Sequence, residues 1–361
     1  FVWNKSVKNY DKKLEEKIKN HLREIDRVVA EENRIYLDED LEELGENNRI
    51  TSEQVEAVVE SIDARLAETP DNKELKKKAK EFKKDILPRK KKYEEALHTF
   101  EGRNSYSKTD HDATFMRMKE DAMLNGQLKP GYNVQIGTEN RYIVGYTIHP
   151  NPTDTKTMIP HLNHLKEKLG TLPENIITDS GYGSEENYEY LEENHLGSYV
   201  KYNKFHWEKK KKNRENPYLI ENMPYNAETD SFICKNEKRL VHKGSRKYVT
   251  EAGYETSRDY YTCEDCRECP YASECKNTEK NRTVQVSHRL NELKRKANEN
   301  LCSEKGLQLR AQRVVEVEQT FGRIKGCWSF RRFHLRGKDK VKIEWGLLAI
   351  AHNITKMALE G

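Results

Sequence analysis

The segment 131–202 restricts the fold more than any other part of this chain. Two β-rich stretches, GYNVQIGTEN and RYIVGYTIH, are separated by turn residues and predict a hairpin. A helix should follow, with Asp154 as its N-cap. Its apolar face would consist of Ile159, Leu162, Leu165 and Leu169. A strand over 175–178, a helix capped by Ser184 and a strand over 198–202 complete the series. This order predicts an α/β unit with a mixed sheet.

The region 8–100 is different, because its apolar residues recur at helical spacing among many charges. The whole chain is 35% charged and only 35% hydrophobic, which is low for one compact globule. Thr51 and Gln54 predict a capping box, and Asp71 should begin a third helix that Pro88 interrupts. We expect a helical hairpin or small coiled coil. It would serve as a dimerisation or DNA-clamping arm, or simply as a solvated spacer.

Composition narrows the functional classes only in part. No stretch approaches about eighteen apolar residues, so no membrane span is expected. No signal peptide is recognisable. The net charge is only +4, so an argument for nucleic-acid binding must rest on where the basic residues lie. The opening FVWNKSVKNY reads like the interior of a domain, and we therefore expect the chain to be a fragment whose true N-terminus lies upstream.

Two carboxylates stand out as candidates for metal-assisted chemistry. Asp179 ends an apolar run and precedes Ser-Gly-Tyr-Gly, where a carboxylate at the end of a strand is placed for function. The alternative is a turn or helix-capping Asp. Glu318 lies on an amphipathic helix expected over 307–325, with Arg313 five residues before it and Lys325 seven after. The alternative here is an exposed helix with alternating charges.

The pair is more specific than either residue alone. Mg²⁺ binds one or two carboxylates and keeps positions for phosphate oxygens, and two such ions stabilise in-line displacement. Basic residues nearby suit phosphates. A two-metal site usually needs three carboxylates, and the sequence offers two in suitable places. Glu316 is a competitor, but it lies about 200° around the helix from Glu318, so both cannot face the sheet.

A cysteine cluster, CEDCRECPYASEC, lies within a stretch that otherwise has little periodic signal, 203–300. Its spacing, C-x2-C-x2-C-x5-C, would allow four thiolates to bind one structural Zn²⁺. The four residues are Cys263, Cys266, Cys269 and Cys275. An iron–sulfur cluster and free thiols are the alternatives. Cys234 could replace one ligand, whereas Cys302 and Cys327 look like ordinary thiols.

Basic and aromatic residues alternate in the segment 323–338. Arg and Lys would neutralise phosphates, and aromatic rings could stack on bases. A strand with its aromatic residues inside is an alternative, and it is compatible with a DNA-binding surface. The residues that we expect to contact DNA are Arg313, Lys325, Arg331, Arg332 and Arg336.

Three strings carry a resemblance to a known family: the segment from DHDATFMRMKEDAM to PTDTKTMIPHL, then ITDSGYGSEENYEYL, and finally RVVEVEQTFGRIKGCWSFRRFHLRGKDKVKIEWGLLAIAHNITKM. Together they resemble a bacterial insertion-sequence DDE transposase with a helical and a Cys-rich insert. The resemblance implies an RNase H-like fold. It identifies Asp179 as the second catalytic Asp, Glu318 as the catalytic Glu and Lys325 as the basic residue that follows. The first catalytic Asp would precede Phe1, and Asp110 and Asp112 resemble a separate string, so they are not assigned as ligands.

The resemblance also implies how the chain is divided and what it does. The segment 1–105 would be the helical insert, 106–202 the first part of the RNase H-like core, 203–300 the basic and Cys-rich insertion, and 301–361 the helix of the catalytic Glu with the basic tail and last helix. The reaction would be Mg²⁺- or Mn²⁺-dependent cleavage at transposon ends, followed by strand transfer into target DNA.

Partners and rival functions follow from the same comparison. The protein would bind double-stranded DNA and form a homo-oligomer. It would be located in the bacterial cytoplasm, associated with the nucleoid, and would not bind a membrane. The rivals are a related metal-dependent nuclease and a non-catalytic DNA-binding remnant. Without the first Asp, the fragment should bind DNA but be inactive.

Overall fold

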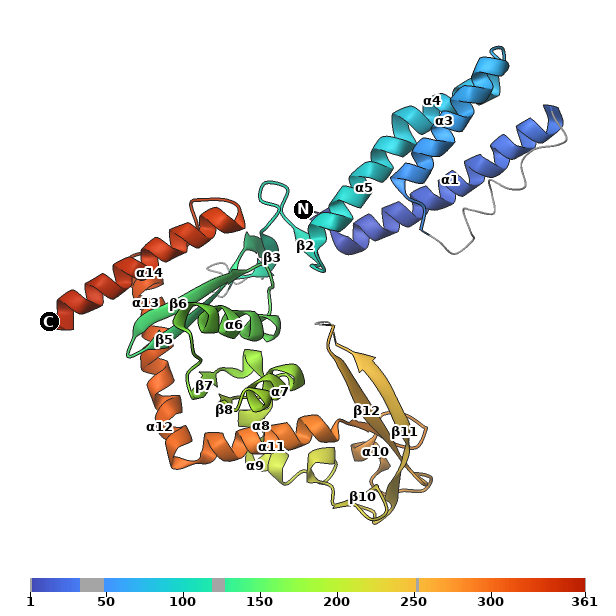
Figure 1. The fold of residues 1–361 in the computed structure, drawn as a ribbon. Helices are drawn as coiled ribbons and strands as arrows, with labels where there is room; N and C mark the ends of the chain where they lie inside the picture. Colours follow the sequence, from blue (N-terminus) through green and yellow to red (C-terminus); the bar gives the residue numbers. More distant parts are fainter. Residues whose placement is uncertain (1, 33–48, 119–126, 251–252, 361) are drawn as a thin grey trace. The chain divides into compact units, whose positions relative to one another are not determined.

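The computed structural model describes residues 2–32, 49–118, 127–250 and 253–360 and shows a mixed α/β protein with small sheets (Figure 1). The chain divides into two compact units. The first consists of Phe1–Tyr132 with Arg336–Lys338, and the second of Asn133–Leu335 with Asp339–Gly361.

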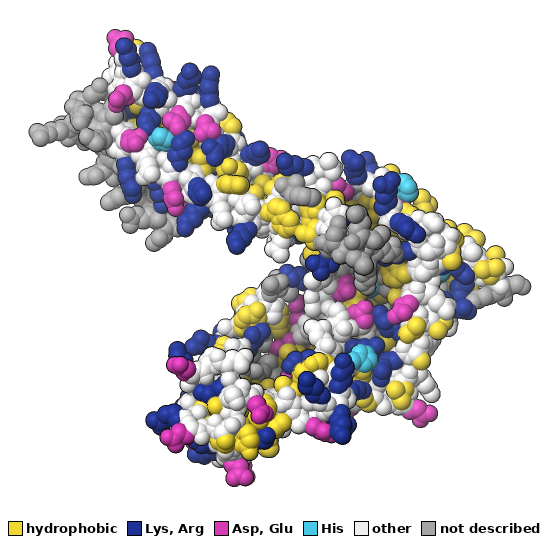
Figure 2. Space-filling view, turned by 180° about the vertical axis from the view of Figure 1, so that it is seen from behind, with side chains coloured by type: hydrophobic (Ala, Val, Ile, Leu, Met, Phe, Trp, Pro, Cys, Tyr) yellow, Lys and Arg dark blue, Asp and Glu magenta, His cyan; other side chains and the backbone are white. Residues whose placement is uncertain are grey.

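The first unit contains a bundle of charged helices. They are α1 (Asn4–Glu32), α3 (Ser52–Glu68), α4 (Lys73–Glu81), the π-helical turn η1 (Phe82–Ile86) and α5 (Leu87–Phe100). Their core is a strip of aliphatic side chains around Phe82: Leu14, Ile18, Leu22, Ile25, Ile50, Val55, Val59, Ile62, Leu75, Ala79 and Ile86. Lys, Arg, Asp and Glu side chains are interspersed over the outside of the bundle (Figure 2). The helices therefore form by burying one apolar face each.

Two local predictions in this bundle need correction, and one is confirmed. Thr51 and Gln54 form the expected capping box. The N-cap of α4 is Asn72 rather than Asp71, because the Asn72 side chain accepts the Leu75 N–H at 2.9 Å. Pro88 does not end the helix. It lies in the first turn of α5, directly after η1, where the wider π-helical turn accommodates a residue that has no N–H to donate.

The rest of the first unit holds short antiparallel pairs: β1 (Val2–Trp3) with β2 (Ser105–Tyr106), and β3 (Thr114–Arg117) with β4 (Leu128–Gly131). Asp110 and Asp112 lie in the turn before β3, and both have structural partners. The Tyr132 hydroxyl donates to the carboxylate of Asp110 and lies 2.8 Å from both of its oxygens. Asp112 Oδ2 accepts the Lys338 N–H at 2.7 Å.

The second unit begins with the expected hairpin, β5 (Asn133–Glu139) paired antiparallel with β6 (Tyr142–His149). Next come α6 (Met158–Leu169), β7 (Asn175–Thr178), α7 (Glu185–Glu193), capped by Ser184 as expected, and β8 (Gly197–Val200). β7 and β8 pair in parallel, in register from Asn175 to Thr178. The four strands form two separate pairs, whereas the sequence predicts one mixed sheet.

Smaller differences concern the ends of these elements. Asp154 does not cap α6: it opens the 3₁₀ turn η2 (Asp154–Lys156), and Thr157 precedes the helix. Leu169, expected on the apolar face of α6, is 48% exposed. β8 ends at Val200, two residues before the predicted end.

The segment between β8 and the last helices contains more strand than its sequence indicates. After the short helices α8 (Phe205–Glu208) and α9 (Lys211–Arg214) come five antiparallel strands in the order β13-β12-β11-β10-β9. Their bounds are β9 (Tyr225–Asn226), β10 (Ser231–Ile233), β11 (Arg239–Val249), β12 (Glu255–Cys263) and β13 (Thr283–Val286). The one-turn helix α10 (Ala272–Cys275) precedes β13, and α11 (His288–Cys302) follows it.

A helical run after α11 carries Glu318. It comprises α12 (Glu304–Arg313), the π-helical turn η5 (Val314–Glu318), α13 (Gln319–Gly322) and a second π-helical turn, η6 (Arg323–Cys327). Val314 is 50% exposed, whereas Thr320 and Ile324 are buried. The π-helical turns change which side chains face inward, so 3.6-residue periodicity fails here.

The last helix, α14 (Lys338–Glu360), buries Val341, Trp345 and Ala349. It joins β6 through Asn353, whose side chain both accepts from the Ile143 N–H and donates to the Ile143 carbonyl, each at 2.9 Å. The opposite face of α14 exposes Ile343, Leu347, Ile350, Ile354 and Met357. None of the described helices is long and apolar enough to cross a membrane.

Candidate functional site

Asp179 directly follows β7, where the chain enters the 3₁₀ turn η3 (Ser180–Tyr182). Its Oδ1 accepts the Gly181 N–H at 2.9 Å, so this oxygen performs the turn-capping role considered from the sequence. Its Oδ2 lies 3.3 Å from Nη2 of Arg313. One carboxylate therefore fixes the turn and also faces a cationic side chain on another element.

Glu318 is the last residue of η5, and its Oε1 lies 3.5 Å from Nη1 of the same Arg313. The Arg313 side chain is 16% exposed, whereas those of Asp179 and Glu318 are 41% and 60% exposed. The structure thus brings Asp179 and Glu318 to one guanidinium group. Arg313 was expected to contact DNA phosphate, but in this structure its partners are these two carboxylates.

The π-helical turn explains how Arg313 and Glu318 meet. In a regular α-helix, residues five apart point about 140° away from each other. In a π-helix the backbone pairs residue i with i+5, so residues at this spacing fall on the same face. η5 starts directly after Arg313 and ends at Glu318. π-helical turns of this kind are frequent at functional sites.

Glu316, the competing carboxylate on this helix, has different partners. One of its oxygens accepts the Arg141 N–H in the turn between β5 and β6, and the other accepts from the Gln312 amide at 3.3 Å. Asn140 and Arg141 in that turn have φ values of 50° and 65°. Glu316 therefore ties the helix to the hairpin, while Glu318 faces Arg313.

A third carboxylate, that of Asp154, lies near Asp179, since an oxygen of each is close to Gly181. Asp154 Oδ1 accepts from the Asn133 amide at 2.7 Å and from the Gln135 amide at 3.2 Å. Tyr182 donates its hydroxyl to Oε1 of Gln135. Burial, together with the charges of Asp154 and Asp179, raises the pKa of Tyr182 well above its usual range, so the phenol stays protonated as a donor.

The predicted DNA-binding residues lie on several elements of the chain. Lys325 lies in η6 with its ammonium 5.2 Å from the centre of the Phe321 ring. Arg331 and Arg332 are exposed, and Arg336 belongs to the first unit. The tail at 328–337 is not a strand. Its Phe330 and Phe333 rings instead lie 6.3 Å from the buried Trp345 ring, so these aromatic residues are part of the packing against α14.

The cysteine cluster is organised by Arg282. Its N–H donates to Cys266 Sγ at 3.4 Å, its carbonyl accepts the Cys263 N–H at 2.9 Å, and its guanidinium donates to Cys275 Sγ at 2.8 Å. Burial and the neighbouring Cys266 raise the pKa of Cys263 to about 12. Among the described residues no three Cys, His, Asp or Glu side chains converge closely enough to hold a metal ion.

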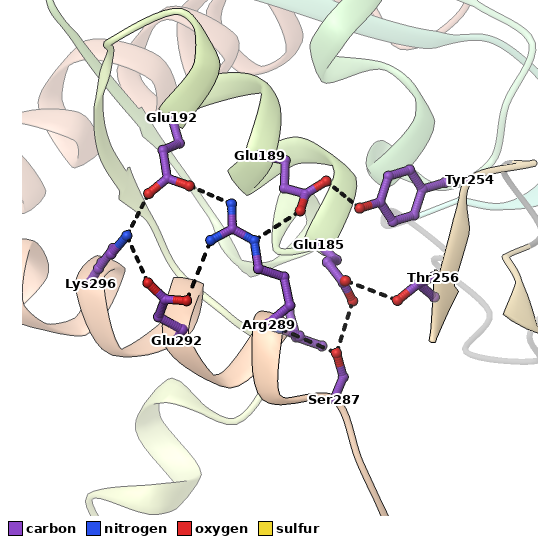
Figure 3. Close-up of polar contacts among 10 residues, drawn as sticks. Glu185, Glu189, Glu192, Tyr254, Thr256, Ser287, Arg289, Glu292 and Lys296 are labelled. Atoms are coloured by element: carbon purple, nitrogen blue, oxygen red, sulfur yellow. Dashed lines mark hydrogen bonds and ion pairs between the residues drawn. The ribbon is translucent and has the colours of Figure 1, made fainter. Parts of the chain in front are cut away.

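A polar network connects the elements around the site (Figure 3). Arg289, on α11, bonds Glu189 at 3.0 Å and Glu192 at 2.5 Å, both on α7. Lys296 adds a second bond to Glu192 at 2.5 Å. Tyr254, directly before β12, donates to Glu189, and Thr256 of β12 donates to Glu185 at 2.9 Å. The helix that follows Asp179 is thereby joined to the helix that leads to Arg313.

Part of the chain matches a known protein family. Residues 233–358 match the family model described as a transposase DDE domain. The match includes Arg313, Glu318 and the cysteine cluster, while Asp154 and Asp179 lie before it. This match supports the resemblance to a DDE transposase. Neither a curated protein nor a solved structure was found to match the chain.

Proposed function

We propose that this protein is a DNA transposase that cleaves DNA at the ends of its element and joins them to target DNA. The observation that carries the proposal is the placing of Asp179 and Glu318 on one guanidinium, that of Arg313, with Glu318 inside the segment matching the transposase DDE domain. Two carboxylates from separate elements, held together around a positive charge, are the ligand types that phosphoryl-transfer sites use.

The donor set fits a divalent metal. Asp179 and Glu318 offer carboxylate oxygens, the ligands that Mg²⁺ and Mn²⁺ prefer, and Arg313 shows that a cation is accommodated between them. Bound there, the metal would stabilise the attacking and leaving oxygens of an in-line displacement at phosphorus. Two carboxylates are fewer than a two-metal site normally uses. The RNase H-like fold remains part of this proposal.

The chain's own residues would have separate roles. Asp179 and Glu318 would hold the metal, and Arg313 would orient both carboxylates before DNA binds. Lys325, seven residues after Glu318, would contact a DNA phosphate as a point charge. Arg331 and Arg332 are exposed and would add sequence-independent contacts to the duplex, which weaken as salt rises.

The test is a cleavage and joining assay with the purified protein. Labelled DNA carrying the ends that flank the gene is incubated with a circular target plasmid and Mg²⁺ or Mn²⁺. Cut ends and joined products are expected. Asp179→Asn, Glu318→Gln and Arg313→Gln should each reduce both products at least about tenfold, since each removes a ligand or its positioning partner. Glu304→Gln, in the exposed first turn of α12, is the matched control.

The outcomes separate the rival functions. Cut ends without joined products would identify a metal-dependent nuclease. DNA binding without cutting in the presence of metal would identify a non-catalytic DNA-binding protein. Cleavage that is unaffected by Asp179→Asn or Glu318→Gln would show that the reaction takes place at another site and would overturn the proposal.

A further inference from the structure

Lys201 directly follows strand β8, just as Asp179 directly follows strand β7. The two strands are parallel and pair in register to their last residues, so Lys201 and Asp179 come next at the same end of the strand pair. The chain beyond Asp179 also returns to Lys201: a methyl carbon placed on Gly183 would lie 2.6 Å from the Lys201 carbonyl oxygen. The backbone of Lys201 is therefore held against the turn that begins at Asp179.

The Lys201 side chain lies among the charges of the candidate site. Burial, followed by the positive charges of Arg310 and Arg313, lowers the pKa of the Lys201 ammonium. The negative charges of Asp179 and Glu318 act in the opposite direction. Lys201 is half-buried, yet within the described ranges no carboxylate lies at ion-pair distance from it.

Two further cations meet at the ring of Phe205, which is 1% exposed. The Arg310 guanidinium lies 5.1 Å from the ring centre and the Lys209 ammonium 3.9 Å from it, which is cation–π distance. Arg310 donates to the Leu301 carbonyl at 3.1 Å, and Lys209 lies 3.1 Å from Cys302 Sγ. Arg310 Nε is buried and has no partner in the part of the chain that the structure describes.

These three groups form one cation cluster: Lys201, Lys209 and Arg310. His206 shows that they lie close together, because burial and then the positive charges of these same three side chains lower its pKa. None of the three pairs with a carboxylate of a described residue. The only contacts of the cluster are therefore a ring, a carbonyl and a thiol among the described residues, and none of these neutralises positive charge. An anion among them would lower the repulsion within the cluster.

We propose that the cation cluster binds backbone phosphates of the DNA strand that enters the Asp179–Glu318 site. The inference rests on the proposed function and adds a phosphate-binding place to it, on elements other than those of Lys325, Arg331 and Arg332. A phosphodiester carries one negative charge and offers acceptor oxygens to ammonium and guanidinium groups. The fixed backbone of Lys201 and the stacking on Phe205 mean that little side-chain freedom is lost on binding.

The first experiment measures binding of a fluorescently labelled DNA duplex to the purified protein at a series of NaCl concentrations, without divalent metal. Loss of one phosphate contact reduces the salt slope by about 0.9, which corresponds to about eightfold weaker binding at about 0.1 M salt. Lys201→Gln and Lys209→Gln should each show this loss, and Lys201→Arg should keep most of the affinity. Lys204→Gln is the matched control, because Lys204 lies in the same segment but pairs with Glu221 at 2.6 Å. Its binding and salt slope should stay close to those of the wild type.

A second measurement uses the wild-type protein and does not depend on how a variant folds. Acetic anhydride acetylates accessible lysine ammonium groups, and mass spectrometry gives the extent at each lysine. The DNA duplex should slow acetylation of Lys201 and Lys209 several-fold relative to the free protein and leave that of Lys204 unchanged. Circular dichroism spectra matching the wild type would show that the substituted proteins remain folded.

The results distinguish this inference from the proposed function. If Lys201→Gln and Lys209→Gln bind DNA with wild-type affinity and salt slope, and DNA does not protect the two lysines, the further inference is wrong, while loss of cleavage in Asp179→Asn would still support the proposed function. An equal loss in Lys204→Gln would indicate attraction by overall charge and would also overturn a defined phosphate site. Weaker binding with an unchanged salt slope would assign Lys201 to the fold instead of a phosphate contact. If the wild-type protein does not bind the duplex at low salt, both proposals fail.

Discussion

Replacing Lys90 should destabilise the helical bundle of the first unit more than any exposed substitution in it. The Lys90 side chain is 0% exposed, and its ammonium lies 2.7 Å from both Asp11 and Glu15 on α1. Lys90→Met removes the charge but keeps most of the volume, so two carboxylates lose their buried partner. Removing one member of a buried ion pair costs about 3–5 kcal/mol. We expect the lower end, because Glu15 is 19% exposed and Arg49 stays 3.3 Å from Asp11.

Hydrogen exchange followed by mass spectrometry measures this effect locally. A loss of about 3 kcal/mol in the free energy of opening corresponds to exchange about 100-fold faster for the protected amides of α1 and α5. Lys91→Met is the matched control, because the Lys91 side chain is 54% exposed and pairs with Glu56, which is itself 42% exposed. The expected change for that variant is within about 1 kcal/mol. Equal effects of the two substitutions, or unchanged exchange in Lys90→Met, would refute the reasoning.

Three further predictions concern a helix cap, a pH dependence and the cysteine cluster. Asn72→Ala should lower the opening free energy of α4 by about 1 kcal/mol, whereas Asp71→Ala should change it little; hydrogen exchange of α4 would measure both. Lys296 and Arg289 hold the pKa of Glu192 below its usual 4.5, so their stabilisation is complete above that pH and is lost as pH falls through the lowered value. Acid unfolding of Glu192→Gln should lack this component, and an unchanged pH profile would contradict the assignment. Purified protein should carry one zinc per chain by metal analysis, and Cys266→Ala should lose it while Cys327→Ala keeps it; metal-free, freshly reduced protein would exclude the zinc site.

Local signals in the sequence predicted the elements that carry Asp179. The bounds of β7 follow from a short apolar run, and Ser184 accepts the Asn187 N–H as an N-cap should. The capping box of Thr51 and Gln54 could also be predicted from the sequence. These features depend on residues within a few positions of each other, so propensity and side-chain chemistry decide them.

The rest depended on information that single-sequence periodicity does not contain. The five-stranded sheet was largely missed because β11 is exposed along most of its length and shows no apolar alternation. The contact between Arg313 and Glu318 requires a π-helical turn, which reads in sequence as an ordinary helix. Asp is common at helix N-caps, so the sequence predicts that Asp154 caps the following helix. Its carboxylate instead accepts hydrogen bonds from the side-chain amides of Asn133 and Gln135 on β5.

The network around Arg289 suggests why a long segment can lie between Asp179 and Glu318 without separating them. α7 follows the Asp179 turn, and α11 leads into α12, which ends at Arg313. The two helices share one apolar core, which includes Tyr188 and Leu191 of α7 and Leu293, Ala297 and Leu301 of α11. Arg289 and Lys296 then fix their register through Glu189 and Glu192. Apolar contacts alone are non-directional, whereas these charged hydrogen bonds are directional. The spacing of the two carboxylates therefore depends on the α7–α11 contact.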